Sequence, residues 1–249
     1  MKYKFIVDWL LDYSKEAGDK SFVVGVSGGI DSALTSTLCA ETGVNTYVVS
    51  LPIKQGGAEL SRAETHIAAL AEKYDNVIPL QFELDKVFTE FSNLFQKEDK
   101  LALANSRSRL RMTTLYQVAA MTNSIVVGTG NKVEDFGVGF YTKYGDGGVD
   151  ISPIADLMKS EVREAAIEFG VGLEIISAAP TDGLWEDGRT DEDQIGATYD
   201  ELEWAMTFGG DKRKLKKRQK EVLSIFYGFQ HRNKHKMNPI PICKNIKNG

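Results

Sequence analysis

The residues with the clearest chemical potential form one short run, GVSGGIDS, at positions 25–32. Its two adjacent glycines allow a tight turn that points successive backbone N–H groups toward the start of a helix, where an anion is favoured. The two serines add hydroxyl donors, and Asp31 supplies a carboxylate suited to Mg²⁺. The run contains neither the Gly-Lys-Ser/Thr of a Walker A loop nor G-x-G-x-x-G. We interpret it as a loop that holds the pyrophosphate of ATP, with a plain strand-to-helix turn as the alternative.

A second group of chemically useful residues lies further along the chain. One predicted helix carries three arginines, Arg107, Arg109 and Arg111. Their side chains could bind phosphate or carboxylate, although a solvated basic face explains them equally well. The loop 128–150 is longer than most connections, which favours a functional role. In or beside it lie two lysines and three acidic residues: Glu134, Lys143, Asp146, Asp150 and Lys159. The lysines could bind phosphates, and Glu134 could share a metal ion with the aspartate of the first run.

Strand and helix patterns alternate along the chain and predict how these residues are positioned. Runs typical of buried strands cover residues 21–26, 44–51, 76–82, 124–129 and 173–177. Helical patterns cover residues 2–16, 30–41, 60–74, 84–95, 103–122 and 157–169. The alternation predicts a single α/β domain over residues 1–249, with a Rossmann-like parallel sheet of about five strands and helices on both faces.

Ligands of such sheets bind outside the carboxyl ends of the strands. We therefore expect the loops that follow the strands to converge on one site. These loops come after Val26, Leu51, Thr129 and Ser177.

The composition is that of an ordinary globular protein, with 42% hydrophobic and 26% charged residues among 249. The formal net charge of -5 gives no reason to expect nucleic-acid binding. Cys39 and Cys243 are far apart and have no metal-binding spacing. Asp8 and Asp12 interrupt the N-terminal apolar run, and no run approaches membrane-spanning length, so we expect a cytoplasmic protein without membrane contact.

The run GVSGGIDS resembles the PP-loop of the ATP pyrophosphatases, which cut ATP between its α and β phosphates and transfer AMP. The further motifs, in chain order, closely resemble those of the ammonia-dependent NAD synthetases over nearly the whole chain. They are N-x-x-x-R-x-R-M, GTGNK-x-E, TKYGDGG-x-D, K-x-x-V-R, P-T-x-x-L-W, G-x-TDE-x-x-x-G-x-TYD and a late HK. TKYGDGG is the most specific of them.

This resemblance implies an enzyme that amidates deamido-NAD with ammonia in two steps, through an acyl-adenylate, and releases AMP and pyrophosphate. The ATP site would comprise Gly25, Val26, Ser27, Gly28, Gly29, Ile30, Asp31, Ser32, Thr129, Lys159 and Thr181. Asp31 and Glu134 would bind Mg²⁺. The deamido-NAD site would comprise Arg109, Lys143, Asp150, His235 and Lys236. The family works as a homodimer, and no residue is expected to act as a covalent nucleophile.

Free ammonia is the expected nitrogen source. Glutamine-using members add an amidase domain, and 249 residues filled by the synthetase pattern leave no room for one. An acyl-adenylate must be kept from water, so we expect a closing lid and assign it to residues 179–195. The C-terminal segment with His235 and Lys236 is expected to fold over the substrate.

Two other functions remain open on the residues alone. A PP-loop enzyme that modifies RNA would need a basic RNA-binding extension, and often paired reactive cysteines, whereas the one strongly basic run, 211–223, suits a helix with solvated charges. A nucleotide sensor without turnover would need neither Glu134 nor Lys143. His66, in an amphipathic helix, is expected to be a surface or half-buried residue rather than to bind a ligand.

Overall fold

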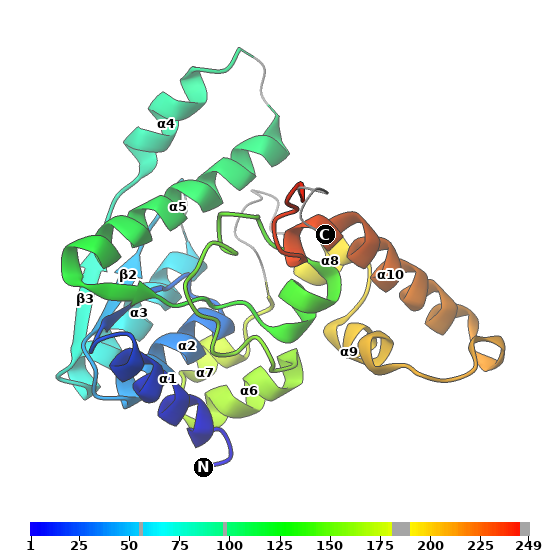
Figure 1. The fold of residues 1–249 in the computed structure, drawn as a ribbon, viewed down its shortest axis with the longest axis horizontal. Helices are drawn as coiled ribbons and strands as arrows, with labels where there is room; N and C mark the ends of the chain where they lie inside the picture. Colours follow the sequence, from blue (N-terminus) through cyan, green and yellow to red (C-terminus); the bar gives the residue numbers. More distant parts are fainter. Residues whose placement is uncertain (55–56, 97–98, 181–189, 245–249) are drawn as a thin grey trace.

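The computed structural model describes residues 1–54, 57–96, 99–180 and 190–244, and Figure 1 shows their arrangement. The strands are β1 (Ser21–Gly25), β2 (Thr46–Ser50), β3 (Val77–Gln81) and β4 (Ser124–Val126). The helices are α1 (Lys4–Glu16), α2 (Ile30–Glu41), α3 (Ala58–Lys73), α4 (Asp85–Asn93), α5 (Lys100–Thr122), η1 (Lys132–Val138), α6 (Lys159–Glu168), α7 (Leu173–Ile176), α8 (Asp191–Ile195), α9 (Tyr199–Thr207), η2 (Lys212–Lys214) and α10 (Lys217–Met237). None of the described helices combines the length and apolarity needed to cross a membrane.

The four strands form one parallel sheet in the order β3-β2-β1-β4. β1 lies in the interior of the sheet and pairs with β2 on one side and with β4 on the other. The carboxyl ends of the strands therefore share one edge, and the strand order reverses between β1 and β4, where such sheets bind their ligands. The Rossmann-like parallel α/β fold predicted from the sequence is confirmed.

The predicted fifth strand, residues 173–177, is wrong, because this segment forms the short helix α7. The N–H of Ile175 turns back to the carbonyl of Gly172 at 3.0 Å, and the Ile175 side chain lies buried in the core. A short apolar run suits a buried helical turn as well as a strand, so the pattern alone could not distinguish them. In the part of the chain that the structure describes, the only pairing beyond the named strands is a single parallel bridge between Val127 and Ile151.

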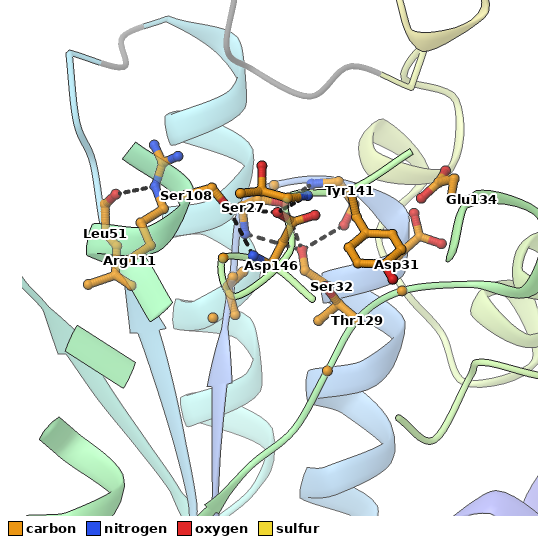
Figure 2. Close-up of a pocket in the computed structure, with 18 of the residues that line it drawn as sticks. Ser27, Asp31, Ser32, Leu51, Ser108, Arg111, Thr129, Glu134, Tyr141 and Asp146 are labelled. Atoms are coloured by element: carbon orange, nitrogen blue, oxygen red, sulfur yellow. Dashed lines mark hydrogen bonds between the residues drawn. The ribbon is translucent and has the colours of Figure 1, made fainter. Parts of the chain in front are cut away.

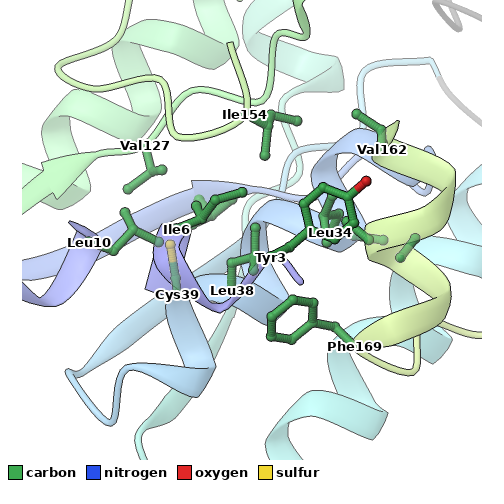
Figure 3. Close-up of a cluster of buried hydrophobic side chains, with 14 of the residues drawn as sticks. Tyr3, Ile6, Leu10, Leu34, Leu38, Cys39, Val127, Ile154, Val162 and Phe169 are labelled. Atoms are coloured by element: carbon green, nitrogen blue, oxygen red, sulfur yellow. The ribbon is translucent and has the colours of Figure 1, made fainter. Parts of the chain in front are cut away.

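Alternate side chains of β1 pack into different cores, because successive residues of a strand point to opposite faces. Phe22 and Val24 belong to a cluster with α1, α2 and α6, whereas Val23 packs with α4 and α5 on the other face. Figure 3 shows the first cluster, which includes Leu10 of α1 and Leu38 of α2. Both faces of the sheet are thus covered by helices, and this packing fixes the strands whose ends carry the site.

A separate hydrophobic cluster holds the C-terminal part of the chain together beside the sheet. It joins η1, α9 and α10, and its buried members include Val133, Tyr199 and Phe226. Figure 1 shows α9 and α10 extending away from the sheet. The basic run 211–223 leads into α10 with its charged side chains exposed, as the sequence predicts. This C-terminal cluster holds α9 against η1, and α9 also contacts α6.

The predicted location of His66 is wrong, because its side chain is buried. α3 packs against α2, and Nε2 of His66 lies 2.9 Å from Oγ of Ser36. A hydrogen-bonding partner inside the interface allows an imidazole to be buried there.

Candidate active site

A cavity of about 420 Å³ opens at the carboxyl edge of the sheet. All of residues 25–32, which we call the glycine-serine loop, line it together with Thr129, Glu134, Lys159 and Lys236. The segments after β1, β2 and β4 reach the cavity, and so does the segment after α7. The structure therefore brings together most of the residues that the sequence assigns to ATP and the metal.

The glycine-serine loop has a geometry that few side chains would permit. Gly28 has a φ of +89°, and a Cβ atom at this position would lie 2.2 Å from the carbonyl oxygen of Glu59. Oγ of Ser32 accepts from the N–H of Ser27 at 3.2 Å and donates to the carbonyl of Gly29 at 2.9 Å. No side chain caps the N-terminus of α2, so its positive dipole end is available to an anion.

Three ionisable side chains, Asp31, Glu134 and Lys159, meet at one end of the cavity, and we call them the buried ion cluster. Nζ of Lys159 lies 2.5 Å from Oδ2 of Asp31 and 3.0 Å from Oε1 of Glu134. The lysine side chain is 3% exposed, and each carboxylate side chain is 17% exposed. Asn131 donates to Oδ1 of Asp31 at 3.0 Å, and the hydroxyl of Tyr199 donates to Oε1 of Glu134. Each member is hydrogen-bonded, as buried charges require.

Burial and mutual attraction together set the protonation of the buried ion cluster. Burial alone would lower the pKa of Lys159, but the two carboxylates outweigh it and raise that pKa above its ordinary value. Burial would also raise the pKa of Glu134, but the charge of Lys159 and the hydrogen bond from Tyr199 hold it below its ordinary value. The pKa of Asp31 is raised, chiefly by burial, in spite of Lys159. Lys159 is therefore charged and Glu134 ionised at neutral pH.

The buried ion cluster has the charge arrangement of a cation site. Figure 2 shows Asp31 and Glu134 at the same end of the pocket, and an ammonium group lies between their carboxylates. Carboxylate oxygens are the ligands that Mg²⁺ prefers. Among the described residues, no group of three or more His, Cys, Asp or Glu side chains could hold a metal ion. A divalent cation bound here would complete its coordination with water and phosphate oxygens, as Mg²⁺ commonly does.

Arg111 lies at the opposite end of the cavity from the buried ion cluster, as Figure 2 shows. Its Nε donates to the carbonyl of Leu51 at 3.0 Å, and burial lowers its pKa to about 10, so it remains charged at neutral pH. Between the two ends, Oγ of Ser108 donates to Oδ1 of Asp146 at 2.6 Å. Of the three helix arginines that could bind an anion, Arg111 is the one that lines the cavity.

Four of the five residues predicted for deamido-NAD gather beside the cavity. Nζ of Lys143 donates to the carbonyl of His235 at 2.8 Å, and Nε of Arg109 donates to the carbonyl of Lys143 at 3.3 Å. Lys236 follows His235 in α10, and its Nζ donates to the carbonyl of Tyr141 at 2.7 Å. We call Arg109, Lys143, His235 and Lys236 the basic rim. Its members come from three separate segments, so only the fold brings them together.

One predicted residue, Asp150, lies apart from this arrangement. Asp150 does not line the cavity, and it accepts hydrogen bonds from the Tyr116 hydroxyl at 2.9 Å and from the N–H of Val126 at 2.8 Å. Thr181 lies outside the described residues, as does most of the predicted lid, residues 181–189.

Two residues that contact the buried ion cluster, Asn131 and Tyr199, are absent from the site predicted from the sequence. Asn131 is fully buried, and its Oδ1 accepts from the N–H of Glu134 at 3.1 Å, which fixes the start of η1. Both residues lie within motifs, GTGNK and TYD, and motif membership is the only sequence signal that could have identified them. Their contacts with Asp31 and Glu134 join distant positions, which no local pattern encodes.

Comparison with known proteins gives a consistent family. A sequence model described as NAD synthase matches residues 2–239. An NH(3)-dependent NAD(+) synthetase of Alkaliphilus metalliredigens is 38% identical and covers 97% of this chain and 98% of its own. One of Mesoplasma florum is 41% identical over 82% of this chain and 84% of its own.

Two solved structures are similar over almost the whole chain. An NMN synthetase of Francisella tularensis superposes with a TM-score of 0.85 at 31% identity, covering 98% of both chains. An NH3-dependent NAD synthetase of Campylobacter jejuni superposes with a TM-score of 0.78 at 25% identity, covering 97% of both chains.

Proposed function

The chain belongs to the NAD synthase family, and from that premise we propose how its residues carry out the reaction. The function is the ATP-dependent amidation of deamido-NAD with ammonia, which yields NAD, AMP and pyrophosphate. One observation carries the assignment of the site: the glycine-serine loop and the carboxylates of Asp31 and Glu134 line the same cavity. ATP with a divalent cation needs both an anion-binding loop and a pair of acidic ligands.

In the first step, a carboxylate oxygen of deamido-NAD attacks the α-phosphorus of ATP, and the bond from that phosphorus to pyrophosphate breaks. The glycine-serine loop binds the pyrophosphate part of ATP, and Thr129, Lys159 and Thr181 make further contacts with the nucleotide. Asp31 and Glu134 hold Mg²⁺, which supplies positive charge to the phosphates when bound. Position and charge, rather than covalent chemistry, account for the rate of this step.

In the second step, ammonia attacks the acyl carbon, loses a proton, and displaces AMP as the carbon–oxygen bond breaks. The adenylate already carries a good leaving group, so no protein nucleophile is needed. Cys39 is buried, and burial raises the pKa of its thiol, while Cys243 does not line the cavity. Neither cysteine has the setting of a nucleophile.

The basic rim binds the anionic parts of deamido-NAD. Lys236 lines the cavity, Lys143 contacts the carbonyl of the neighbouring His235, and Arg109 contacts the carbonyl of Lys143. Phosphates favour such positively charged groups. Asp150 belongs to the same proposed substrate site, although the structure provides hydrogen-bonding partners for it inside the fold.

A homodimer in the cytoplasm is the assembly that we propose. α4 and the residues after it expose four large apolar side chains: Val87, Phe91, Leu94 and Phe95. A group of exposed apolar side chains of this kind favours a protein interface, and a second copy of this chain is the proposed occupant. Light scattering of the purified protein should give twice the mass of the chain. Phe91→Ser should lower the measured mass toward that of a single chain. A monomeric wild type would contradict the dimer.

A product assay tests the function. The protein is incubated with ATP, Mg²⁺, deamido-NAD and ammonium, and NAD, AMP and pyrophosphate are quantified by chromatography. Equal yields of the three products are expected, with little NAD when glutamine replaces ammonium. Asp31→Ala should lower the yield about a hundredfold or more, while Glu41→Gln, which alters a surface carboxylate, should leave it unchanged. Failure to form AMP with ammonium in excess would refute the assignment.

Nicotinate mononucleotide is a second candidate substrate. The observation that favours it is the NMN synthetase of Francisella tularensis, whose TM-score of 0.85 exceeds the 0.78 of the Campylobacter jejuni NAD synthetase. The same assay run with nicotinate mononucleotide and with deamido-NAD decides between them by the ratio of kcat/KM.

A further inference from the structure

Tyr199 contacts two members of the buried ion cluster through different parts of one side chain. Its hydroxyl donates to Oε1 of Glu134, and Nζ of Lys159 lies 4.9 Å from the centroid of its ring. The residue is only 1% exposed. Oε1 of Glu134 also accepts a hydrogen bond from Lys159, so two donors from different elements converge on one carboxylate oxygen. Together they define the direction in which this carboxylate points.

The backbone of Tyr199 is held in place by contacts outside the buried ion cluster. Its N–H donates to Oε1 of Glu192 at 2.8 Å. The preceding Thr198 caps α9 in a reciprocal capping box with Glu201, and Nε of Arg218 in α10 donates to Glu201 at 2.8 Å. The position of the hydroxyl is therefore fixed within the C-terminal cluster, to which η1 and its Glu134 also belong.

Tyr199 does not line the cavity, although Glu134 and Lys159 do. Any effect of its hydroxyl on a ligand in the cavity must therefore act through the groups that it contacts. The hydroxyl contacts two carboxylates, and Glu134 is the nearer of them, because Oδ2 of Asp191 lies at 3.4 Å. Removal of this hydroxyl should therefore mainly affect the binding of the ligand that Glu134 contacts.

We propose that Tyr199 is a positioning residue that orients Glu134 to bind the divalent cation of the nucleotide. This inference rests on the proposed function, which assigns Asp31 and Glu134 to that cation. Groups that hydrogen-bond to a metal ligand typically change metal affinity about 10–100-fold when removed. The hydroxyl is the part of Tyr199 that orients Glu134, because it makes the hydrogen bond to that carboxylate. The ring makes the packing contacts and the contact with Lys159.

The test is a titration with Mn²⁺, in which free Mn²⁺ is followed by electron paramagnetic resonance in the presence of α,β-methylene-ATP. Tyr199→Phe keeps the ring and removes only the hydroxyl, and it should weaken Mn²⁺ binding about tenfold or more. Tyr74→Phe is the matched control, because Tyr74 also donates to a glutamate and lies under a lysine, but away from the cavity. It should bind Mn²⁺ like the wild type.

A double-mutant cycle identifies the route of the effect. In a Glu134→Gln background, Tyr199→Phe should cause no further loss of Mn²⁺ affinity if the hydroxyl acts through Glu134. A merely structural role would instead lower affinity by the same factor in both backgrounds. In kinetics, Tyr199→Phe should raise the KM for Mg²⁺ and leave the KM for ammonium unchanged.

The outcomes separate this inference from the function on which it rests. Wild-type protein that makes NAD but binds no Mn²⁺ overturns the cation site and with it the role of Tyr199. If the wild type binds Mn²⁺ and Tyr199→Phe binds it with the same affinity, only the positioning role of Tyr199 is overturned. A Tyr199→Phe protein that is unfolded by circular dichroism, while Tyr74→Phe is folded, also refutes it, because the hydroxyl is then structural.

Discussion

Two lysine–tyrosine–glutamate groups in this molecule share the same contacts in opposite surroundings. In the surface group, the Tyr74 hydroxyl donates to Glu41, and Nζ of Lys73 lies 4.6 Å from the tyrosine ring centroid and 3.6 Å from Oε1 of Glu41. In the buried ion cluster, Tyr199 makes the same two contacts, with Lys159 at 4.9 Å from its ring centroid. Hydrogen-bonding chemistry alone does not distinguish the two groups.

Their surroundings distinguish them. The side chains of Lys73 and Glu41 are 58% and 32% exposed, whereas that of Lys159 is only 3% exposed. Water screens the surface charges, so such pairs contribute about 0–1 kcal/mol. A buried charge that loses its partner costs about 3–5 kcal/mol. The same three residue types can therefore decorate a surface or define a site, and burial decides which.

The largest expected difference in the free energy of unfolding is between two single variants, in which Lys159 or Lys73 is replaced by methionine, a side chain of similar length and no charge. Lys159→Met should lower the free energy of unfolding by about 3–5 kcal/mol in EDTA, because it leaves Asp31 and Glu134 without their counter-ion. Lys73→Met should lower it by less than about 1 kcal/mol. Urea unfolding measures both. Added Mg²⁺ should restore part of the stability of Lys159→Met, and equal losses in the two variants would break the comparison.

The next largest effect concerns His66, a buried titratable residue that forms no ion pair with any residue that the structure describes. Burial lowers the pKa of His66 from 6.5 to about 4, opposed only in part by the carbonyl of Ala33 and the charge of Glu174. Between these pKa values the unfolded chain binds a proton that the folded chain does not, so stability falls as pH falls from 6.5 to 4. The loss attributable to His66 should approach about 3 kcal/mol.

Urea unfolding between pH 7 and pH 4 checks this sign and size. The carboxylates also titrate in that range, so the measure is the difference between wild type and His66→Gln. The stability difference between the two proteins should shrink as the pH falls. A difference that is constant with pH would show that the His66 imidazole has the same pKa in the folded and unfolded chains, which would contradict this account.

The smallest expected effect lies in the surface group itself. Glu41→Gln removes the charge opposite Lys73 but keeps an acceptor for Tyr74, so it should change the free energy of unfolding by about 0.5 kcal/mol or less. That change should disappear in 1 M salt, where surface charges are screened. Urea unfolding at low and high salt measures it, and a loss above 2 kcal/mol would contradict the account of the surface group.

The sequence was sufficient to predict the layers of the fold and the position of the glycine-serine loop at the carboxyl edge of the sheet. The four observed strands fall within the first four predicted ranges, because strand runs alternate with amphipathic helices and need no distant contact to be recognised. The predicted strand at 173–177 fails because three apolar residues, interrupted by Glu174, are compatible with either a strand or a buried helical turn. The glycine-serine loop is recognisable because its glycines and serines are adjacent.

The contacts of the site could not be predicted in the same way. Tyr199 and Glu134 are 65 positions apart, and Lys159 and Asp31 are 128 apart. Which side chains meet depends on how η1 packs against α9 and how α6 packs against α2, and such packing has no local signature. Burial of His66 was missed for a related reason, because its partner Ser36 lies on another helix.

The most direct test of the proposed chemistry follows an oxygen atom. Deamido-NAD carrying ¹⁸O at both carboxylate oxygens is incubated with the protein, ATP, Mg²⁺ and ammonium, and the products are examined by mass spectrometry. If the carboxylate attacks the α-phosphorus, AMP should gain one ¹⁸O and pyrophosphate none, since the carbon–oxygen bond breaks when ammonia attacks. NAD should retain the other ¹⁸O. Unlabelled AMP, or label in pyrophosphate, would contradict the acyl-adenylate route and the role of the cavity that we assign to it.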